Sequence, residues 1–543
     1  MRMVSNCFHC QQPFTITERD LAFYQKVSPR IKNQAFPVLP PTHCPDCRME
    51  RRMITRNDYS LYSRSCDLCH KSIISAYADS KDYPVYCKDC WWSDQWDATG
   101  IDATFDWNRP FFTQFSELRN KVPRLALINR NAENSDYIHY ASNNKNCYLI
   151  FNADGNQDCY YSDSIDDCQN SLDLFWSGKC ELSYELISGH ACYNSQFCRH
   201  SDNLSDCYFC QYCDDCHDCF GCFGLAHKQY YIYNQPYTKE EYQEKLKGLL
   251  EKKSSHQGLE QLKREVNQFF LTLPHRYATI TDSEDCTGDY LHRCQRCDQC
   301  YQITRSQDCK FVTDGGTIKD SYDGNYCGYL NSELMYEVQD CWFGYRMLFS
   351  TTCWNCYEMY YSDHCFYSNN CFGCIGLRKK QYCIFNQQYT KEAYEKLLPK
   401  MIEHMMQTKE WSEFFPKELS LFTKTEKARI DGIDKGKAIS NGSNIPDHIN
   451  EVDDSILQYP LACENCSKSF LILPQELSFY RKHCLPLPTY CFVCRQRRRA
   501  QSLPKRQLYQ RNCQKCQIEL LSPYEPSRPE IIYCNPCYQH HWK

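Results

Sequence analysis

The most evident chemistry of this 543-residue chain lies in eight Cys-x-x-Cys pairs, four near each end. The turn within such a pair points two sulfurs at one ion, so two pairs make one tetrahedral thiolate site. The spacing therefore predicts four structural zinc sites per chain, each closed by four thiolates with no position left open for water. The expected ligands are Cys7, Cys10, Cys44, Cys47, Cys66, Cys69, Cys87, Cys90, Cys463, Cys466, Cys491, Cys494, Cys513, Cys516, Cys534 and Cys537.

The two ends of the chain match in more than their cysteines. The hexapeptide "LAFYQK" near the N-terminus corresponds to "LSFYRK" near the C-terminus, and "CPDCRMERRM" corresponds to "CFVCRQRRRA". Both ends hold 18 residues between the second and third pairs, which predicts a duplicated tandem zinc module. Each module resembles the treble-clef and zinc-ribbon class, a likeness that implies zinc but leaves function open. Replacement of a ligand by His43, His70 or His483 stays open.

The central cysteines follow a different pattern. Residues 206–224 hold six cysteines, each three after the last, and longer stretches repeat Asn/Asp–Cys/Ser–Tyr every twelve residues. A helix has a period of about 3.6 and a strand a period of 2, so a column at twelve predicts a narrow solenoid with small side chains inside. The pattern resembles the twelve-residue Cys-rich β-helix of beetle antifreeze proteins, without their Thr array. We expect these cysteines to be buried and metal-free; a thiol-lined metal store and disulfides under oxidation are the alternatives.

A second block repeats the first at an offset of 152 residues. The expected fold is mainly β: a β-helix of twelve residues per turn in two duplicated blocks with helical caps, between the zinc modules. Thr238 and Glu241 predict a capping box at the first cap, and the cysteine phase predicts a bulge near 328–340. The layout resembles an uncharacterised family of Cys-rich zinc proteins from environmental bacteria. The expected divisions are zinc module 1–100, connector 101–136 with a short helix after Pro110, block 137–227, cap 228–285, block 286–379, cap 380–423, flexible linker 424–457 and zinc module 458–543.

Composition and motifs set the expected class and compartment. The net charge is −5, no run of 18 apolar residues is present, and no apolar stretch precedes Cys7. We therefore expect a cytoplasmic protein with reduced thiols and no membrane span. The sequence has no Gly-rich phosphate loop, nucleophile elbow or His-Glu-x-x-His motif, so we expect a non-enzymatic protein and identify no small-molecule substrate.

Charge favours a nucleic-acid partner. Residues 495–512 hold seven basic and no acidic side chains, and the matching residues 48–65 hold five basic and two acidic. Basic segments that leave a zinc knuckle are typical of phosphate contacts, so structured RNA or DNA is the leading partner. The alternatives are a solvated helix face, pairing with the acidic first block, or a protein-interaction scaffold or surface-binding protein that uses the outward Tyr and Asn/Asp columns. The candidate nucleic-acid contacts are Arg48, Arg51, Arg52, Arg56, Arg495, Arg497, Arg498, Arg499, Lys505 and Arg506.

Overall fold

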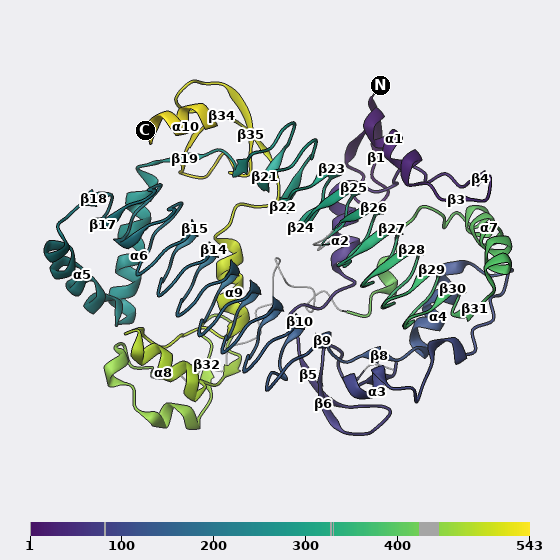
Figure 1. Ribbon diagram of the computed structural model, residues 1–543, viewed down its shortest axis with the longest axis horizontal. Helices are drawn as coiled ribbons and strands as arrows, with labels where there is room; N and C mark the ends of the chain where they lie inside the picture. Colours follow the sequence, from purple (N-terminus) through teal and green to yellow (C-terminus); the bar gives the residue numbers. More distant parts are fainter. Residues whose placement is uncertain (1, 81–82, 326–327, 329–330, 423–444, 543) are drawn as a thin grey trace.

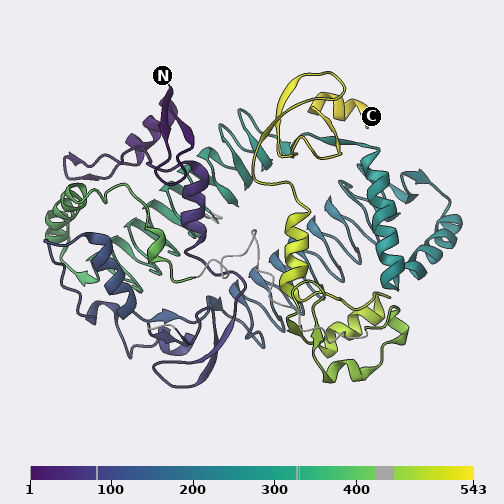
Figure 2. The same cartoon turned by 180° about the vertical axis from the view of Figure 1, so that it is seen from behind.

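The computed structural model of the protein describes residues 2–80, 83–325, 328, 331–422 and 445–542. Within these residues the chain is mainly strand, with ten α-helices around the strands. Figures 1 and 2 show two stacks of short strands, which we call the first ladder (residues 129–232) and the second ladder (residues 280–384). The cysteine-rich modules at the two chain ends pack beside these stacks.

The N-terminal module joins short antiparallel strand pairs to three helices. Its elements are β1 (Arg2–Asn6), β2 (Pro13–Thr17), α1 (Glu18–Val27), β3 (Arg30–Ile31), β4 (Gln34–Ala35), α2 (Pro45–Met53), β5 (Tyr62–Ser65), β6 (Ser72–Ser75), β7 (Val85–Tyr86) and α3 (Lys88–Trp92). The connector contains α4 (Phe111–Lys121), which starts directly after Pro110 as predicted. It ends in β8 (Arg124–Leu125), which pairs in parallel with β7 and leads into the first ladder.

The first ladder is a run of parallel strands in which every pair is offset by twelve residues, for example Phe151 against Asp163 and Asp163 against Phe175. Isolated bridges at the same offset continue the pairing between the named strands. Its strands are β9 (Asn129–Arg130), β10 (His139–Ser142), β11 (Phe151–Asp154), β12 (Asp163–Asp166), β13 (Phe175–Gly178), β14 (Ile187–His190), β15 (Arg199–Asp202), β16 (His217–Phe220) and β17 (Gln229–Ile232).

The period of three in the cysteines has a backbone cause. In each three-residue step of the first ladder, the residue before the inward one adopts a positive φ; Asn146, Asp158, Asn194 and Asp206 lie between 44° and 53°. Asn and Asp tolerate this left-handed conformation better than other non-glycine residues, which explains their column in the sequence. The residue that follows each corner points inward, and the inward cysteines, with Ile150 and others, form one buried cluster.

A helical cap follows the first ladder: β18 (Gln235–Pro236), α5 (Lys239–Lys253) and α6 (His256–Leu271). The predicted capping box is confirmed, because Thr238 accepts from the Glu241 backbone N–H and the Glu241 carboxylate accepts from the Thr238 backbone N–H. After β19 (Pro274–Arg276), the second ladder consists of β20 (Ile280–Thr281), β21 (Gly288–His292), β22 (Cys300–Thr304), β23 (Gln307–Lys310), β24 (Thr313–Gly316), β25 (Ile318–Tyr322), β26 (Ser332–Tyr336), β27 (Gly344–Leu348), β28 (Cys356–Tyr360), β29 (Asn369–Phe372) and β30 (Gln381–Ile384).

The second ladder departs from the twelve-residue offset at one place that matters for the sequence pattern. Between β25 and β26 the offset is fourteen, with Ile318 opposite Ser332, and it returns to twelve from β26 onward. The two additional residues lie between these strands and account for the change of cysteine phase, which the sequence places near 328–340. The chain then runs through β31 (Gln387–Gln388) into the second cap, α7 (Lys391–Gln407).

The C-terminal module repeats the plan of the N-terminal one. Its elements are β32 (Leu461–Ala462), β33 (Ser469–Phe470), α8 (Pro474–Lys482), α9 (Phe492–Gln501), β34 (Tyr509–Asn512), β35 (Glu519–Ser522), β36 (Ile531–Tyr533) and α10 (Asn535–His541). Of the linker expected to be flexible, residues 424–444 lie outside the described residues. Residues 445–457 are packed instead, because Ile449 and Ile456 are buried and the Asp447 carbonyl accepts from the His256 N–H at 3.0 Å.

The two modules are placed equivalently relative to the two ladders. In the N-terminal module β7 pairs with β8, the strand before the first ladder, and in the C-terminal module β36 pairs with β19, the strand before the second ladder. Each module also sends a basic helix to the other ladder: α2 lies against the second ladder and α9 against the first, as Figure 1 shows. Each module therefore contacts both ladders.

Candidate metal centres and the basic helices beside them

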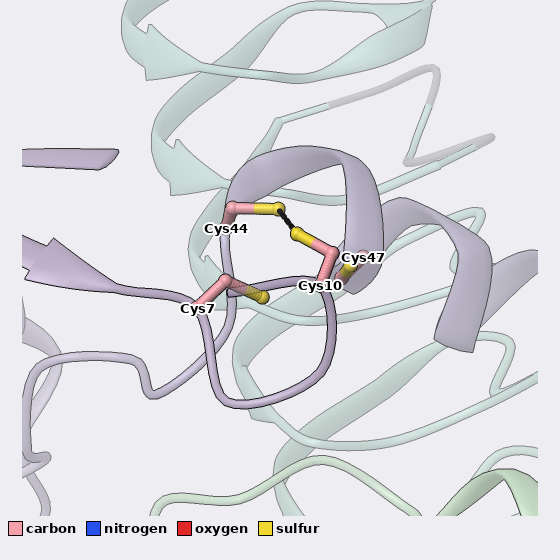
Figure 3. A group of neighbouring side chains, drawn as sticks. All are labelled: Cys7, Cys10, Cys44 and Cys47. Atoms are coloured by element: carbon pink, nitrogen blue, oxygen red, sulfur yellow. Dashed lines mark hydrogen bonds between the residues drawn. The ribbon is translucent and has the colours of Figure 1, made fainter. Parts of the chain in front are cut away.

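The sixteen predicted ligands gather into four groups, each with all four Sγ atoms within 4.8 Å of one another. In Figure 3, Cys7 and Cys10 from one loop face Cys44 and Cys47 at the start of α2. One Sγ–Sγ distance in each group is 3.7 Å (Cys10–Cys44), 3.9 Å (Cys69–Cys87), 3.7 Å (Cys466–Cys491) or 3.6 Å (Cys516–Cys534). Tetrahedral thiolates 2.3 Å from a zinc ion stand ~3.8 Å apart. All four groups therefore fit a four-coordinate metal ion.

The same local structure builds every group. In the first pair of the N-terminal site, the Gln11 N–H donates to the Cys7 carbonyl at 3.0 Å and closes the knuckle turn. In the second pair, the first cysteine is the N-cap of a helix, as Cys44 is for α2 and Cys491 is for α9. A helix N-terminus stabilises negative charge, so this position favours a thiolate ligand. The metal site and the start of the basic helix are thus one structural unit.

Backbone N–H groups prepare the first cysteine of three sites for ionisation. Burial raises the pKa of Cys7, but hydrogen bonds from the N–H groups of Cys10, Cys44 and His9 outweigh it and lower the pKa to about 6. The same balance lowers the pKa of Cys66 to about 7 and that of Cys513 to about 6. Burial and neighbouring thiols instead raise the pKa of Cys47. A cation among the four sulfurs would stabilise the thiolate form of all of them.

The histidines beside these cysteines lie outside the four groups, which among the described residues consist of cysteine alone. His43 Nδ1 lies 2.8 Å from the Thr42 hydroxyl, and His483 Nδ1 lies 3.3 Å from the Gln196 amide nitrogen. The structure gives no support for the replacement of a cysteine ligand by histidine at these sites.

The cysteines of the ladders are free in the described part of the chain and, apart from the half-buried Cys286, buried; no three of them come together as a metal-binding group there. Their thiols donate to backbone carbonyls; Cys207 Sγ, for example, lies 3.4 Å from the carbonyl oxygens of Ser205 and Cys216. Burial raises the pKa of Cys159 and of Cys210 well above the usual value. These two thiols are neutral packing groups of low reactivity.

The basic residues of α2 do not face solvent. Arg48, Arg51 and Arg52 are all buried. Arg48 Nε lies 2.9 Å from Asp323, and Arg51 Nη2 lies 3.0 Å from Glu337. Arg52 donates to the Asn325 side chain at 2.7 Å. Helix α2 is therefore held on the second ladder by acidic and polar side chains of that ladder, a contact that we call the α2 seat.

Just beyond α2, Arg56 is also buried and reaches both ladders. Its Nη1 lies 2.8 Å from Asp340 of the second ladder. Its guanidinium lies 3.5 Å from the ring centroid of Tyr140, which belongs to the first ladder.

Helix α9 forms the equivalent contact with the first ladder, which we call the α9 seat. Arg495 and Arg499 are buried and share the carboxylate of Asp173, with Arg499 Nη1 at 2.6 Å from Oδ1. Arg499 also donates to the Tyr161 carbonyl at 3.1 Å, and Gln496 donates to Asp163 at 3.2 Å. Asp173, like Asp323 and Glu337, lies at a corner with positive φ.

These seats correct the predicted nucleic-acid surface. Six of its ten residues are buried against the protein itself, so the structure withdraws them from contact with phosphate: Arg48, Arg51, Arg52, Arg56, Arg495 and Arg499. Arg498 and Lys505 are exposed, Arg497 is half-buried, and Arg506 donates to Gln302 at 2.5 Å. The sequence alternative of pairing with the acidic first block is observed for α9, whereas α2 pairs with the second ladder. Asp173 and the partners in the second ladder were not identified from the sequence; the acidic excess of residues 137–225 was the available signal for Asp173.

The tyrosine column of the first ladder is largely covered rather than free. Tyr160, Tyr184 and Tyr208 are each less than a tenth exposed. They share a buried cluster with the C-terminal module, in which the Tyr184 and Tyr480 rings lie 5.9 Å apart between centroids. This part of the predicted protein-binding face is an internal packing surface.

The chain matches no protein-family model and no curated protein. In the described part of the chain, no helix is both long and apolar enough to cross a membrane. What the geometry supports is a metal-binding protein with a four-cysteine site at two places in each terminal module.

Proposed function

We propose that the protein is a non-enzymatic, zinc-braced binding scaffold. In this proposal four structural zinc ions fold the two terminal modules, which have the treble-clef or zinc-ribbon arrangement, and each module ties the two ladders to each other. The single observation that carries it is the burial of the module arginines on ladder carboxylates, above all Arg495 and Arg499 on Asp173. The zinc ions would act on the shape of the whole molecule through these helices.

Zinc is the metal of this proposal because of the donor set. Four thiolates in tetrahedral arrangement are the usual ligands of structural zinc, and the N-cap and first turn of a helix supply two of them at well-defined positions. A site with four protein ligands keeps no coordination position for substrate, which agrees with a structural role.

The ladders would be two β-helices of twelve residues per turn. Parallel pairs at offset twelve, corners of positive φ at every third residue and a continuous cluster of inward cysteines support this architecture. Parallel strands stacked at ~4.8 Å give a rigid rod whose length grows with each turn. Such rods would hold the modules, and any partner bound to them, at a fixed separation.

The test is removal of metal from the full chain. We expect four zinc ions per chain by elemental analysis, and we expect a strong chelator to increase hydrogen exchange in α2 and α9 together with the modules. Retention of protection in both helices after complete zinc removal would contradict the brace, and a ratio near two would contradict the four sites.

Binding of structured RNA is the weaker proposal, since it rests on the residues left outside the seats: Arg497, Arg498, Lys505 and Arg506. Replacing Arg497, Arg498 and Lys505 together should then weaken RNA binding at ~50 mM salt and flatten its salt dependence. An unchanged affinity in that variant would remove this function from consideration.

A further inference from the structure

A cavity of about 410 Å³ lies where the first ladder meets two helices of different parts of the chain. Strand β15 forms one wall through Arg199, α6 contributes Lys263 and Arg264, and α9 contributes Arg498. Figures 1 and 2 both show α6 and α9 on either side of the strands of this ladder. Its volume is within the range of small-molecule sites, about 300–1,000 Å³.

The cavity collects more positive charge than it neutralises. Its lining has five cationic side chains but two carboxylates, Glu185 and Glu260. Lys263 takes both carboxylates, at 3.8 Å and 3.2 Å. Arg199, Arg264 and Arg498 are exposed to solvent, and in the part of the chain that the structure describes none of them forms an ion pair.

The residue equivalent to Arg498 in the N-terminal module has acidic partners that Arg498 does not have in the described part of the chain. Arg498 corresponds in the duplicated module to Arg51, three residues beyond the matching "CR". Arg51 lies 3.0 Å from Glu337 and 2.9 Å from Glu413, which follows the second cap. Beside Arg498, the first cap supplies Lys263 and Arg264, and its one carboxylate in the lining, Glu260, pairs with Lys263. The protein therefore neutralises the Arg51 side chain of α2, whereas the Arg498 side chain of α9 lines a cavity.

The electrostatic field in the cavity is positive, in agreement with its excess of cationic side chains. Burial by itself raises the pKa of Glu185, but the surrounding cations Lys263, Arg499, Arg199 and Arg498 outweigh it and hold that pKa below its usual value. A second anion placed among them would be stabilised in the same way.

The floor of the cavity is apolar. Phe197 and Phe209 stack with ring centroids 4.6 Å apart at 12°, and Phe270 from α6 lies beside them in the lining. Guanidinium groups bind phosphate through paired N–H donors and also stack on flat rings. A terminal phosphate carries about −1.5 to −2 at pH 7, so a diphosphate or triphosphate supplies the charge that three guanidinium groups require.

We propose that this cavity binds a nucleoside polyphosphate, with its phosphates held by Arg199, Arg264 and Arg498 and its base placed over the Phe209 and Phe270 side of the floor. The site goes beyond the scaffold function and depends on it only because α9, which carries Arg498, must be seated on the first ladder. Such a ligand would also join β15, α6 and α9, and so add to the brace on this half of the molecule.

The test is calorimetric titration of the zinc-loaded full chain with ATP, ADP, pyrophosphate and a short single-stranded RNA. ATP and ADP should bind more tightly than pyrophosphate, because the base adds contact with the floor. Replacing Arg199 or Arg264 by Gln should weaken ATP binding about tenfold each, since each loses a charge-assisted contact. Both residues are exposed and outside the seats, so zinc content and folding should be unchanged.

Lys247 of α5 provides the matched control, because it is an exposed cation of the same cap outside the cavity lining. Lys247→Gln should bind ATP like the parent chain. The proposal is overturned by absence of ATP binding at ~1 mM, by equal weakening in Lys247→Gln and Arg199→Gln, by pyrophosphate binding as tightly as ATP, or by RNA that displaces ATP at lower concentration. Intact zinc content and α9 protection in the same samples would leave the brace standing.

Discussion

Helices α2 and α9 have matching sequences and pack on matching ladders, yet the ion-pair partners of their arginines differ. The three arginines of α2 and the following Arg56 contact several acceptors of the second ladder, Asp323, Glu337 and Asp340 among them. Helix α9 places two arginines on the single carboxylate of Asp173. The ion pairs of the N-terminal seat are thus distributed over several carboxylates, whereas those of the C-terminal seat share one, Asp173.

This difference indicates which of the two duplicated modules has cationic side chains left to bind a ligand. Buried ion pairs recover their desolvation cost only when the charges are matched, and in the α2 seat Arg48 and Arg51 have carboxylate partners. The α9 seat is smaller and leaves Arg498 at its edge, next to cations of the first cap. In our proposal the N-terminal copy has a structural role, and the C-terminal copy retains a charged surface for a ligand.

Loss of a metal ligand should have the largest effect on both seats. Cys44→Ser and Cys491→Ser each remove a proposed zinc ligand that is also the N-cap of the docking helix, so each should lower the zinc content by one. The module concerned should lose about 5 kcal/mol or more, because structural zinc supplies most of the folding energy of such a unit. Hydrogen exchange of α2 or α9, with zinc analysis, measures both. Protection of the seated helix at the parental level would contradict the coupling.

Removal of the shared carboxylate should come next and should separate the two seats. Asp173→Asn leaves Arg495 and Arg499 buried with no ion-pair partner among the described residues, so we expect a loss of about 3–5 kcal/mol in the protection of α9. Asp323→Asn should cost less, because Arg48 keeps the His43 carbonyl at 2.7 Å and Arg52 keeps Asn325. Equal losses for the two variants would contradict the distributed character of the α2 seat.

Arg51 and Arg498 give the most direct comparison of equivalent residues. Arg51→Gln leaves the buried Glu337 short of a cation and should cost about 2 kcal/mol in the stability of the α2 seat. Arg498→Gln removes an exposed side chain without an ion pair in the described residues and should change stability by less than about 0.5 kcal/mol. Urea-induced loss of α2 or α9 protection measures both, and a larger cost for Arg498 would refute the assignment of its charge to the cavity.

The local features of this fold were accessible from the sequence because they repeat. Cysteine spacing gave the four ligand sets, since a knuckle turn and a helix N-cap fix sulfur positions over a few residues. The Asn/Asp–Cys column predicted the twelve-residue offset, although its cause, a left-handed corner before each inward residue, becomes visible only in the backbone angles. The capping box at Thr238 was predictable for the same reason, because its partners lie three residues apart.

The long-range features were not accessible. Nothing local to "CRQRRRA" indicates that Arg495 and Arg499 meet Asp173, which lies more than 300 residues earlier, or that Arg51 and Arg498 have different environments. A basic segment after a zinc knuckle is equally typical of phosphate binding, so the sequence favoured RNA for residues that pair internally. Helix α2 packs on the second ladder and α9 on the first because charge and apolar area are complementary over whole faces of the ladders. This is a tertiary property that a local stretch of sequence does not show.

The smallest expected effect is a pH dependence confined to the C-terminal module. Glu476 and Asp20 are equivalent residues, one before "LSFYRK" and one before "LAFYQK". Asp20 meets the Lys310 ammonium group of the second ladder at 3.0 Å, whereas Glu476 accepts a hydrogen bond from the Tyr161 hydroxyl of the first ladder. Burial without a cation at contact distance raises the pKa of Glu476 to about 7.

An unfolded glutamate has a pKa of about 4.3, so between the two values the folded module holds more protons than the unfolded one, and its stability must fall as pH rises through 7. Between pH 6 and pH 8 the loss should be about 1 kcal/mol relative to Glu476→Gln, which cannot titrate. The window stays above the acidic range in which thiolate ligands protonate and release metal. Protection of α8 and α9 at the two pH values measures it, with Asp20→Asn as the matched variant. A pH dependence that survives in Glu476→Gln would assign the titration to another group and remove this distinction between the two modules.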